Sequence, residues 1–152
     1  MKKVEILAPV GSQEALYAAV RTGADAVYMG YKKFNARIKA DNFGDEEFKS
    51  AIDYCHSHGV KVNITLNTLV TDNELPEALE TVKKLSQWGA DALILQDMGL
   101  AALIKKAAPT LERHASTQMS VQTVSGVKLL EEQGYTRVVL PRELSKEEIK
   151  RI

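Results

Sequence analysis

The feature that most constrains this chain is a short phrase that recurs along it. Gly-Ala-Asp-Ala followed by an apolar residue spans Gly23–Val27 and again Gly89–Leu93, and a looser copy begins at Gly134. Each copy follows a stripe of apolar residues and leads into a short apolar run. Because glycine tolerates the left-handed conformation that ends a helix, each phrase predicts a helix followed by a strand. The chain is therefore predicted to repeat a βα unit of roughly 20–36 residues, a common unit size in α/β folds.

Six short apolar runs are predicted as strands, and all but the fifth carry few polar residues, as strands of a buried parallel sheet do. They are Val4–Ala8, Ala26–Met29, Val60–Leu66, Ala92–Leu95, Leu111–Ala115 and Arg137–Leu140. Between them, apolar residues recur with helical spacing. The clearest stripe consists of Leu75, Ala78, Leu79, Val82 and Leu85. The last helix is predicted to begin after Ser145, which forms a capping box with Glu148.

Alternating strands and helices imply a parallel sheet with right-handed crossovers, in either an open doubly wound sheet or a (β/α) barrel. The barrel is favoured because no Gly-rich phosphate fingerprint follows the first strand, where Pro9-Val10-Gly11-Ser12 stands instead. Polar residues also gather at the predicted carboxyl ends of the strands, where barrels place their active sites. The predicted fold class is therefore α/β, an incomplete TIM-type (β/α) barrel of about six parallel βα units.

The number of units predicts a partial barrel. A closed barrel has eight βα units and typically about 250 residues, whereas this chain has 152. Residues 1–152 are therefore predicted to form a single partial barrel domain that stops within its sixth helix, with the C-terminal remainder absent. Unpaired edge strands invite association, so we expect a homodimer that forms through the open barrel edges.

The amino-acid composition excludes several classes of protein. The chain has 20 basic and 20 acidic side chains, and zero net charge gives no general attraction to nucleic acid. A hydrophobic content of 45% is typical of a globular domain and excludes a disordered tail. No apolar run approaches the roughly 18 residues of a membrane helix, and Glu5 interrupts any export signal. We therefore expect a cytoplasmic protein without membrane contact.

The candidate catalytic residues lie at or just after the ends of the fourth and fifth strands. They are Gln96, Asp97, His114 and Gln118. A histidine at a strand end could act as a general base or bind a metal, or could be packed and hydrogen-bonded in the barrel. Asp97 could alternatively cap the helix that begins at Met98.

The candidate substrate-binding residues are Arg37, Asn67, Ser116, Thr117, Arg142 and Glu143. Arg142 and Glu143 could bind an anion and a donor, or form a surface ion pair that contributes little. Asn67 could contact a ligand or form a turn. The loop Tyr31–Gly44 interleaves basic and aromatic residues, as nucleic-acid surfaces do, although a solvated loop is the plainer interpretation.

The chain has a single cysteine, which limits the metal cofactors that it can bind by itself. Cys55 precedes His58 by three residues, like half a metal site, but it shares an apolar stripe with Phe48 and Ile52 and is predicted to be a core thiol. Without a second cysteine, neither a disulfide nor a zinc or iron–sulfur site can be completed within this chain. We therefore predict no metal site and no cofactor here.

Several sequence blocks together resemble the collagenase-like peptidase family, number 32 among peptidases of unknown mechanism. They are Glu5-Ile6-Leu7-Ala8-Pro9-Val10-Gly11-Ser12, Gly23-Ala24-Asp25-Ala26-Val27-Tyr28-Met29-Gly30, Phe34-Asn35-Ala36-Arg37, Asn42-Phe43, Thr65-Leu66-Asn67-Thr68, Leu95-Gln96-Asp97, His114-Ala115-Ser116-Thr117-Gln118-Met119 and Pro141-Arg142-Glu143-Leu144-Ser145. They cover essentially the whole chain in order.

The resemblance implies the N-terminal barrel region of an enzyme. Family members are named proteases or collagenases, and others take part in hydroxylation of tRNA or rRNA. Several carry an iron–sulfur cluster on cysteines of a later segment, so a cluster is expected in the full-length protein rather than in these residues. RNA hydroxylation is the leading expectation, with tRNA or rRNA as partner. A peptidase acting on peptides and a non-catalytic binding or assembly module are the alternatives, and this stretch alone is expected to be inactive.

Overall fold

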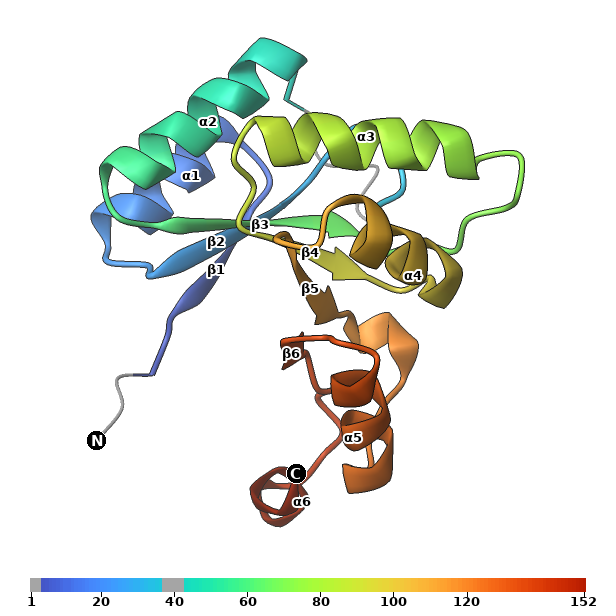
Figure 1. Cartoon of the computed structure of the whole chain (residues 1–152). Coiled ribbons are helices and arrows are strands. Elements are labelled where there is room, and N and C mark those ends of the chain that lie inside the picture. Colours follow the sequence, from blue (N-terminus) through green and yellow to red (C-terminus); the bar gives the residue numbers. More distant parts are fainter. Residues whose placement is uncertain (1–3, 37–42) are drawn as a thin grey trace.

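The computed structural model describes residues 4–36 and 43–152 (Figure 1). The strands are β1 (Leu7–Val10), β2 (Ala26–Gly30), β3 (Lys61–Leu66), β4 (Ala92–Leu95), β5 (Glu112–Ala115) and β6 (Arg137–Val138). The helices are α1 (Gln13–Arg21), α2 (Asp45–Ser57), α3 (Leu75–Gln87), α4 (Met98–Ala107), α5 (Val124–Glu132) and α6 (Lys146–Arg151), with a short 3-10 turn η1 (Thr117–Met119) after β5. No helix among these described residues is long and apolar enough to cross a membrane.

The six strands form one parallel sheet in the order β1-β2-β3-β4-β5-β6. A doubly wound sheet reverses its strand order at a switch point, and this sheet does not. The sheet instead curls into a half-barrel, with helices α1, α2 and α3 over one face of its first strands (Figure 1). The predicted barrel class is confirmed.

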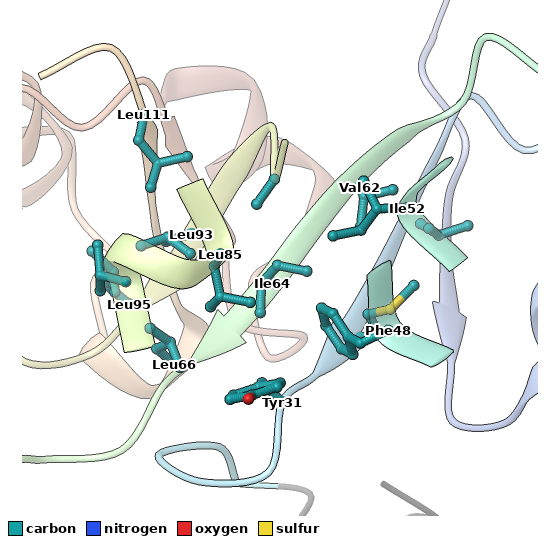
Figure 2. Close-up of a cluster of buried hydrophobic side chains, with 14 of the residues drawn as sticks. Tyr31, Phe48, Ile52, Val62, Ile64, Leu66, Leu85, Leu93, Leu95 and Leu111 are labelled. Atoms are coloured by element: carbon teal, nitrogen blue, oxygen red, sulfur yellow. The ribbon is translucent and has the colours of Figure 1, made fainter. Parts of the chain in front are cut away.

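Alternation along β3 separates the core from the interior of the half-barrel. Val62, Ile64 and Leu66 are fully buried and join the core between the sheet and the helices (Figure 2). Asn63 and Thr65 point to the opposite, concave face, where each lines a cavity. Successive side chains of a strand point to opposite faces, so a polar concave face can coexist with an apolar core.

Each copy of the repeated phrase forms a hydrogen bond that joins the strand after it, β2, β4 or β6, to the preceding strand of the sheet. The Asp25 carboxylate accepts a hydrogen bond from the Ile6 N–H at 2.9 Å, and the Asp91 carboxylate accepts one from the Val62 N–H at 2.7 Å. In the looser third copy, Thr136 replaces the aspartate and donates its hydroxyl to Glu112 at 3.2 Å. Gly89, before Asp91, has a φ of +91°, a conformation that favours glycine. The repeat therefore builds equivalent joints between neighbouring strands.

Two strands, β1 and β6, differ from their predicted bounds by more than one residue. The first strand is Leu7–Val10 rather than Val4–Ala8, and Val4 is 83% exposed. A strand at a sheet edge tolerates proline, so Pro9 continues β1 instead of ending it. The last strand, β6, comprises only Arg137 and Val138.

Candidate active site

A cavity of about 330 Å³ opens on the concave face at the carboxyl ends of the strands. Its lining residues are Leu7, Tyr28, Ala36, Thr65, Asn67, Ile94, Ser116, Thr117, Gln118, Val139, Leu140 and Arg142. We call it the mouth cavity. Five predicted site residues, from three different strand ends, meet in it: Asn67, Ser116, Thr117, Gln118 and Arg142. Barrel enzymes place their active sites at this end of the strands.

A chain of hydrogen bonds crosses the mouth cavity. The Ala36 N–H donates to Asn67 Oδ1 at 3.0 Å, and Asn67 Nδ2 donates to Ser116 Oγ at 3.4 Å. Ser116 Oγ also accepts the Gln118 N–H at 3.2 Å, and Gln96 Nε2 donates to the Gln118 carbonyl oxygen at 3.3 Å. Four predicted site residues and the Ala36 N–H therefore join the segments that follow β2, β3, β4 and β5. The four residues are Asn67, Gln96, Ser116 and Gln118.

The hydrogen-bond network separates candidate residues whose side chains are bonded to the protein from those that are free to contact a substrate. The polar groups of Asn67 and Ser116 are engaged with the protein, so these side chains position the mouth. The side chains of Thr117, Gln118 and Arg142 are exposed, and within residues 4–36 and 43–152 none has a hydrogen-bond or charged partner. These three side chains are therefore the ones free to contact a substrate.

Asp97 and Glu143 are predicted site residues that do not line the mouth cavity. Asp97 caps α4, because its Oδ1 accepts the Leu100 N–H at 2.7 Å, and its Oδ2 accepts the Val70 N–H at 3.3 Å. The capping alternative for Asp97 is therefore the one that the geometry supports. Glu143 is exposed in the turn after β6. Arg37 lies outside the described residues.

The aromatic residues of the loop Tyr31–Gly44 do not form a base-stacking surface, which was the alternative to a solvated loop. Tyr31, Phe34 and Phe43 are all buried in the core. The Tyr31 hydroxyl donates to Asp45 at 2.8 Å, and burial together with this hydrogen bond raises the pKa of Tyr31 to about 12. These three aromatic residues therefore belong to the core, and sequence spacing alone could not distinguish a core role from base stacking.

His114 lies at the other end of the half-barrel interior. It lines a second cavity of about 320 Å³, together with Glu5, Lys61, Asn63, Glu112 and Arg137 near the amino ends of the strands. His114 is only 3% exposed, and its Nε2 lies 3.2 Å from a Glu112 carboxylate oxygen. Sequence reasoning did not single out Glu112, although residues two apart on a strand share a face.

Charged groups of both signs line the second cavity. Arg137 forms an ion pair with Glu5, and its Nη2 donates to Glu5 Oε2 at 3.1 Å. Burial lowers the pKa of His114 below its usual value, against the opposing effect of the Glu112 carboxylate. The hydrogen bond from His114 is also the main cause of the lowered pKa of Glu112. The cavity therefore holds a mostly neutral histidine within an ionic cluster.

Replacing His114 by glutamine is expected to remove a pH dependence of stability. Because burial lowers the folded-state pKa of His114, its contribution to stability is complete above the unfolded pKa of 6.5 and is lost as pH falls towards the folded value. Unfolding in urea between about pH 5 and 7 should show a stability that rises with pH, and a flatter curve for His114→Gln. The exposed His58→Gln is the matched control. An unchanged slope in His114→Gln would contradict the assignment.

The residues described here do not fit an iron–sulfur cluster or another metal centre. Across residues 4–36 and 43–152, no group of three or more His, Cys, Asp or Glu side chains is placed to hold a metal ion. Cys55 is buried in the core on α2, and burial raises the pKa of its thiol to about 11. Cluster ligands are thiolates, which this thiol is poorly disposed to supply.

A curled parallel sheet with a polar cavity at the carboxyl ends of its strands defines a (β/α)-barrel protein with an active-site end. The chain belongs to peptidase family U32, whose sequence profile matches residues 11–152. A solved U32 peptidase structure superposes with a TM-score of 0.77 at 15% identity, over 97% of this chain and 63% of that one.

Curated relatives in the family carry two kinds of name. A 23S rRNA 5-hydroxycytidine synthase of Escherichia coli is 39% identical over 99% of this chain, and tRNA hydroxylation protein P1 of Bacillus subtilis is 35% identical over 98%. A protein named collagenase, from Porphyromonas gingivalis, is 33% identical over 97%. The chain spans 22%, 35% and 35% of the lengths of these three relatives, respectively.

Proposed function

We propose that this chain is the N-terminal barrel part of a protein that hydroxylates nucleosides of tRNA or rRNA. The observation that carries the proposal is the likeness, over nearly the whole chain, to relatives named for rRNA and tRNA hydroxylation. The mouth cavity supports it chemically. Enzymes that modify bases read a flipped base through hydrogen bonds to its edge, and the free amide of Gln118 offers both a donor and an acceptor.

Arg142 supplies the charge that an RNA substrate requires. Its guanidinium lies at the cavity rim without a carboxylate partner among the described residues. Arginine binds phosphate through charge-assisted, bidentate hydrogen bonds. In this proposal, Gln118 contacts the base, Arg142 binds a neighbouring phosphate, and Asn67 with Ser116 keeps the cavity open in the required shape.

The remainder of the catalyst is proposed to lie elsewhere in a longer protein. An iron–sulfur cluster, if the full-length protein holds one, requires cysteines beyond this stretch, because the described residues do not fit it. We accordingly expect the 152-residue chain alone to be inactive, and we propose a cytoplasmic location for the protein, where tRNA and rRNA are modified.

Deletion of the full-length gene, followed by mass spectrometry of nucleosides from purified tRNA and rRNA, tests the proposed function. A hydroxylated nucleoside should disappear and should return with a wild-type copy, but not with a copy carrying both Gln118→Ala and Arg142→Ala. The matched control copy carries Gln122→Ala and Arg151→Ala, which change the same residue types outside the mouth cavity. An unchanged nucleoside profile after deletion would exclude the proposal.

A peptidase is the second candidate, because a relative is named collagenase. The arrangement of the described residues gives little support to a peptidase mechanism. His114 and Ser116 line different cavities, and no hydrogen bond joins them. Cleavage of gelatin by the full-length protein, abolished equally by His114→Ala and Ser116→Ala, would favour the peptidase over RNA hydroxylation.

The open edges of the sheet support a further proposal, a homodimer. Among the described strands, β1 and β6 each pair on one side only. Beside β1, Ile6 is 58% and Val4 is 83% exposed, so two apolar side chains face solvent at this edge of the sheet. We expect the 152-residue chain to be dimeric at micromolar concentration by light scattering, whereas Ile6→Lys should shift it towards the monomer. A monomeric wild-type chain would contradict this and would leave a non-catalytic assembly module without support.

A further inference from the structure

A third cavity lies away from the mouth, between α4 and the end of α5. Its volume is about 150 Å³, and it shares no lining residue with the mouth cavity. The side chains that matter here are those of Lys105, Lys106, Arg113 and Tyr135, and Met98 and Ala101 complete much of the wall. We call it the outer cavity. None of the residues that line it is acidic.

The positive charge of the outer cavity is fixed in place. Arg113 is 8% exposed, and its guanidinium lies 5.7 Å from the Tyr135 ring centre. Its Nη2 donates to the Gly134 carbonyl at 2.7 Å, and its Nη1 donates to the carbonyls of Gln133 and Ala101 at 3.3 and 3.4 Å. A side chain at Gly134 would collide with this guanidinium, because an added Cβ would lie 2.6 Å from Nη2.

Carbonyl oxygens are the only hydrogen-bond partners of these cations in the described part of the chain. Lys105 makes one long hydrogen bond, 3.4 Å to the Gln133 carbonyl, and Lys106 has no partner there. Cations at the end of a helix interact favourably with its terminal carbonyls. That interaction applies to Arg113 and also to Lys105 and Lys106, which lie in the last turn of α4. It leaves most hydrogen-bond donors of the two lysines unused.

Tyr135 provides the independent observation. The residue is 6% exposed and lines the outer cavity, yet its hydroxyl has no hydrogen-bond partner. A buried polar group without a partner is destabilising and calls for a bound species that would satisfy it. Tyr135 lines the same cavity as three cations, and a hydroxyl can donate a hydrogen bond to an anion.

We propose that the outer cavity binds a phosphate group, which accepts hydrogen bonds from Tyr135, Lys105 and Lys106 and faces the Arg113 guanidinium. The volume of about 150 Å³ equals that of about five waters at roughly 30 Å³ each, which suits a group of five heavy atoms. The phosphate could be free or part of an RNA backbone. Binding at this cavity does not depend on the proposed hydroxylation, since the two cavities are separate.

Titration of the 152-residue chain with inorganic phosphate tests the site. Phosphate should raise the melting temperature more than acetate or chloride of equal ionic strength does. Calorimetry should show Lys106→Gln weakening phosphate binding by about tenfold, while Lys128→Gln, which removes the same charge from the exposed face of α5, should bind as wild type. Equal effects of phosphate and chloride, or equal affinities of the two lysine variants, would overturn the proposal.

Tyr135→Phe distinguishes a binding hydroxyl from one that is merely buried. Without phosphate, the variant should melt no lower than wild type, because it removes an unsatisfied group. With phosphate it should bind several-fold more weakly. Unchanged phosphate affinity in Tyr135→Phe would refute the role of Tyr135 and with it the site.

A short single-stranded RNA then separates the two sources of phosphate. If RNA binds and inorganic phosphate competes with it, and if Lys106→Gln weakens both, the ligand is a backbone phosphate. If phosphate binds and RNA does not, the ligand is a small phosphate compound. If neither binds, the site is refuted. None of these results measures hydroxylation, so failure here leaves the proposed function standing.

Discussion

Replacing Asn67 by alanine is expected to lower RNA hydroxylation by the full-length protein about 100-fold, because misplacement of catalytic-site groups by about 1 Å costs that much. Asn67 joins the segment after β2 to β5 through bonds of 3.0 Å to Ala36 and 3.4 Å to Ser116. Without it, the backbone of η1, which carries the free side chain of Gln118, loses part of its support. Hydroxylated nucleoside, measured by mass spectrometry, is the readout.

Conservative variants separate positioning from substrate contact. Asn67→Asp keeps the acceptor for the Ala36 N–H but loses the donor to Ser116, so it should retain more activity than Asn67→Ala. Gln118→Ala, whose amide has no protein partner among the described residues, should instead raise KM and leave the melting temperature unchanged. Equal activity of Asn67→Ala and wild type would remove Asn67 from the site.

Replacing Phe48 by alanine is expected to destabilise the fold by about 4 kcal/mol, as large-to-small substitutions of buried aromatic residues do. Phe48 is fully buried in the cluster drawn in Figure 2. Its ring lies 5.3 Å from that of Tyr31, 6.1 Å from that of Phe43 and 6.3 Å from that of Trp88. The loss is large compared with a typical unfolding free energy of about 5–15 kcal/mol.

Urea unfolding followed by circular dichroism measures this loss. Phe48→Leu is the matched control, since it keeps much of the buried volume and should cost clearly less than Phe48→Ala. A Phe48→Ala midpoint close to that of wild type would mean that Tyr31 and Phe43 do not pack against Phe48 as described.

The relatives are named either for RNA hydroxylation or as a collagenase. These two activities would require different arrangements of residues in an active site. Acyl transfer requires a nucleophile within hydrogen-bond reach of its base. Here the buried imidazole of His114 faces Glu112 at one end of the barrel interior, while Ser116 belongs to the mouth network at the other. Recognition of a base requires neutral donors and acceptors with a nearby cation, which Gln118 and Arg142 provide.

The strand and helix order of this protein was determined by local sequence. Gly23 and Gly89, with the aspartates that follow them, end helices and begin strands through short-range backbone geometry and hydrogen bonds. The repeat therefore predicted alternating strands and helices, and the polar residues at the strand ends then favoured a barrel. The gathering of Asn67, Ser116, Thr117, Gln118 and Arg142 was also accessible, because the carboxyl ends of parallel strands share one edge.

Only the tertiary structure decided which of those polar residues are free to contact a substrate. Asn67 and Asp97 look alike in sequence, as polar residues after a strand, yet one bridges two loops and the other caps a helix. His114 was placed at the mouth by its position along β5, but its side chain lies with residues of β3 and β6. The physical reason is that partners distant in sequence, and the curvature of the sheet that brings them together, decide where a side chain's hydrogen bonds go.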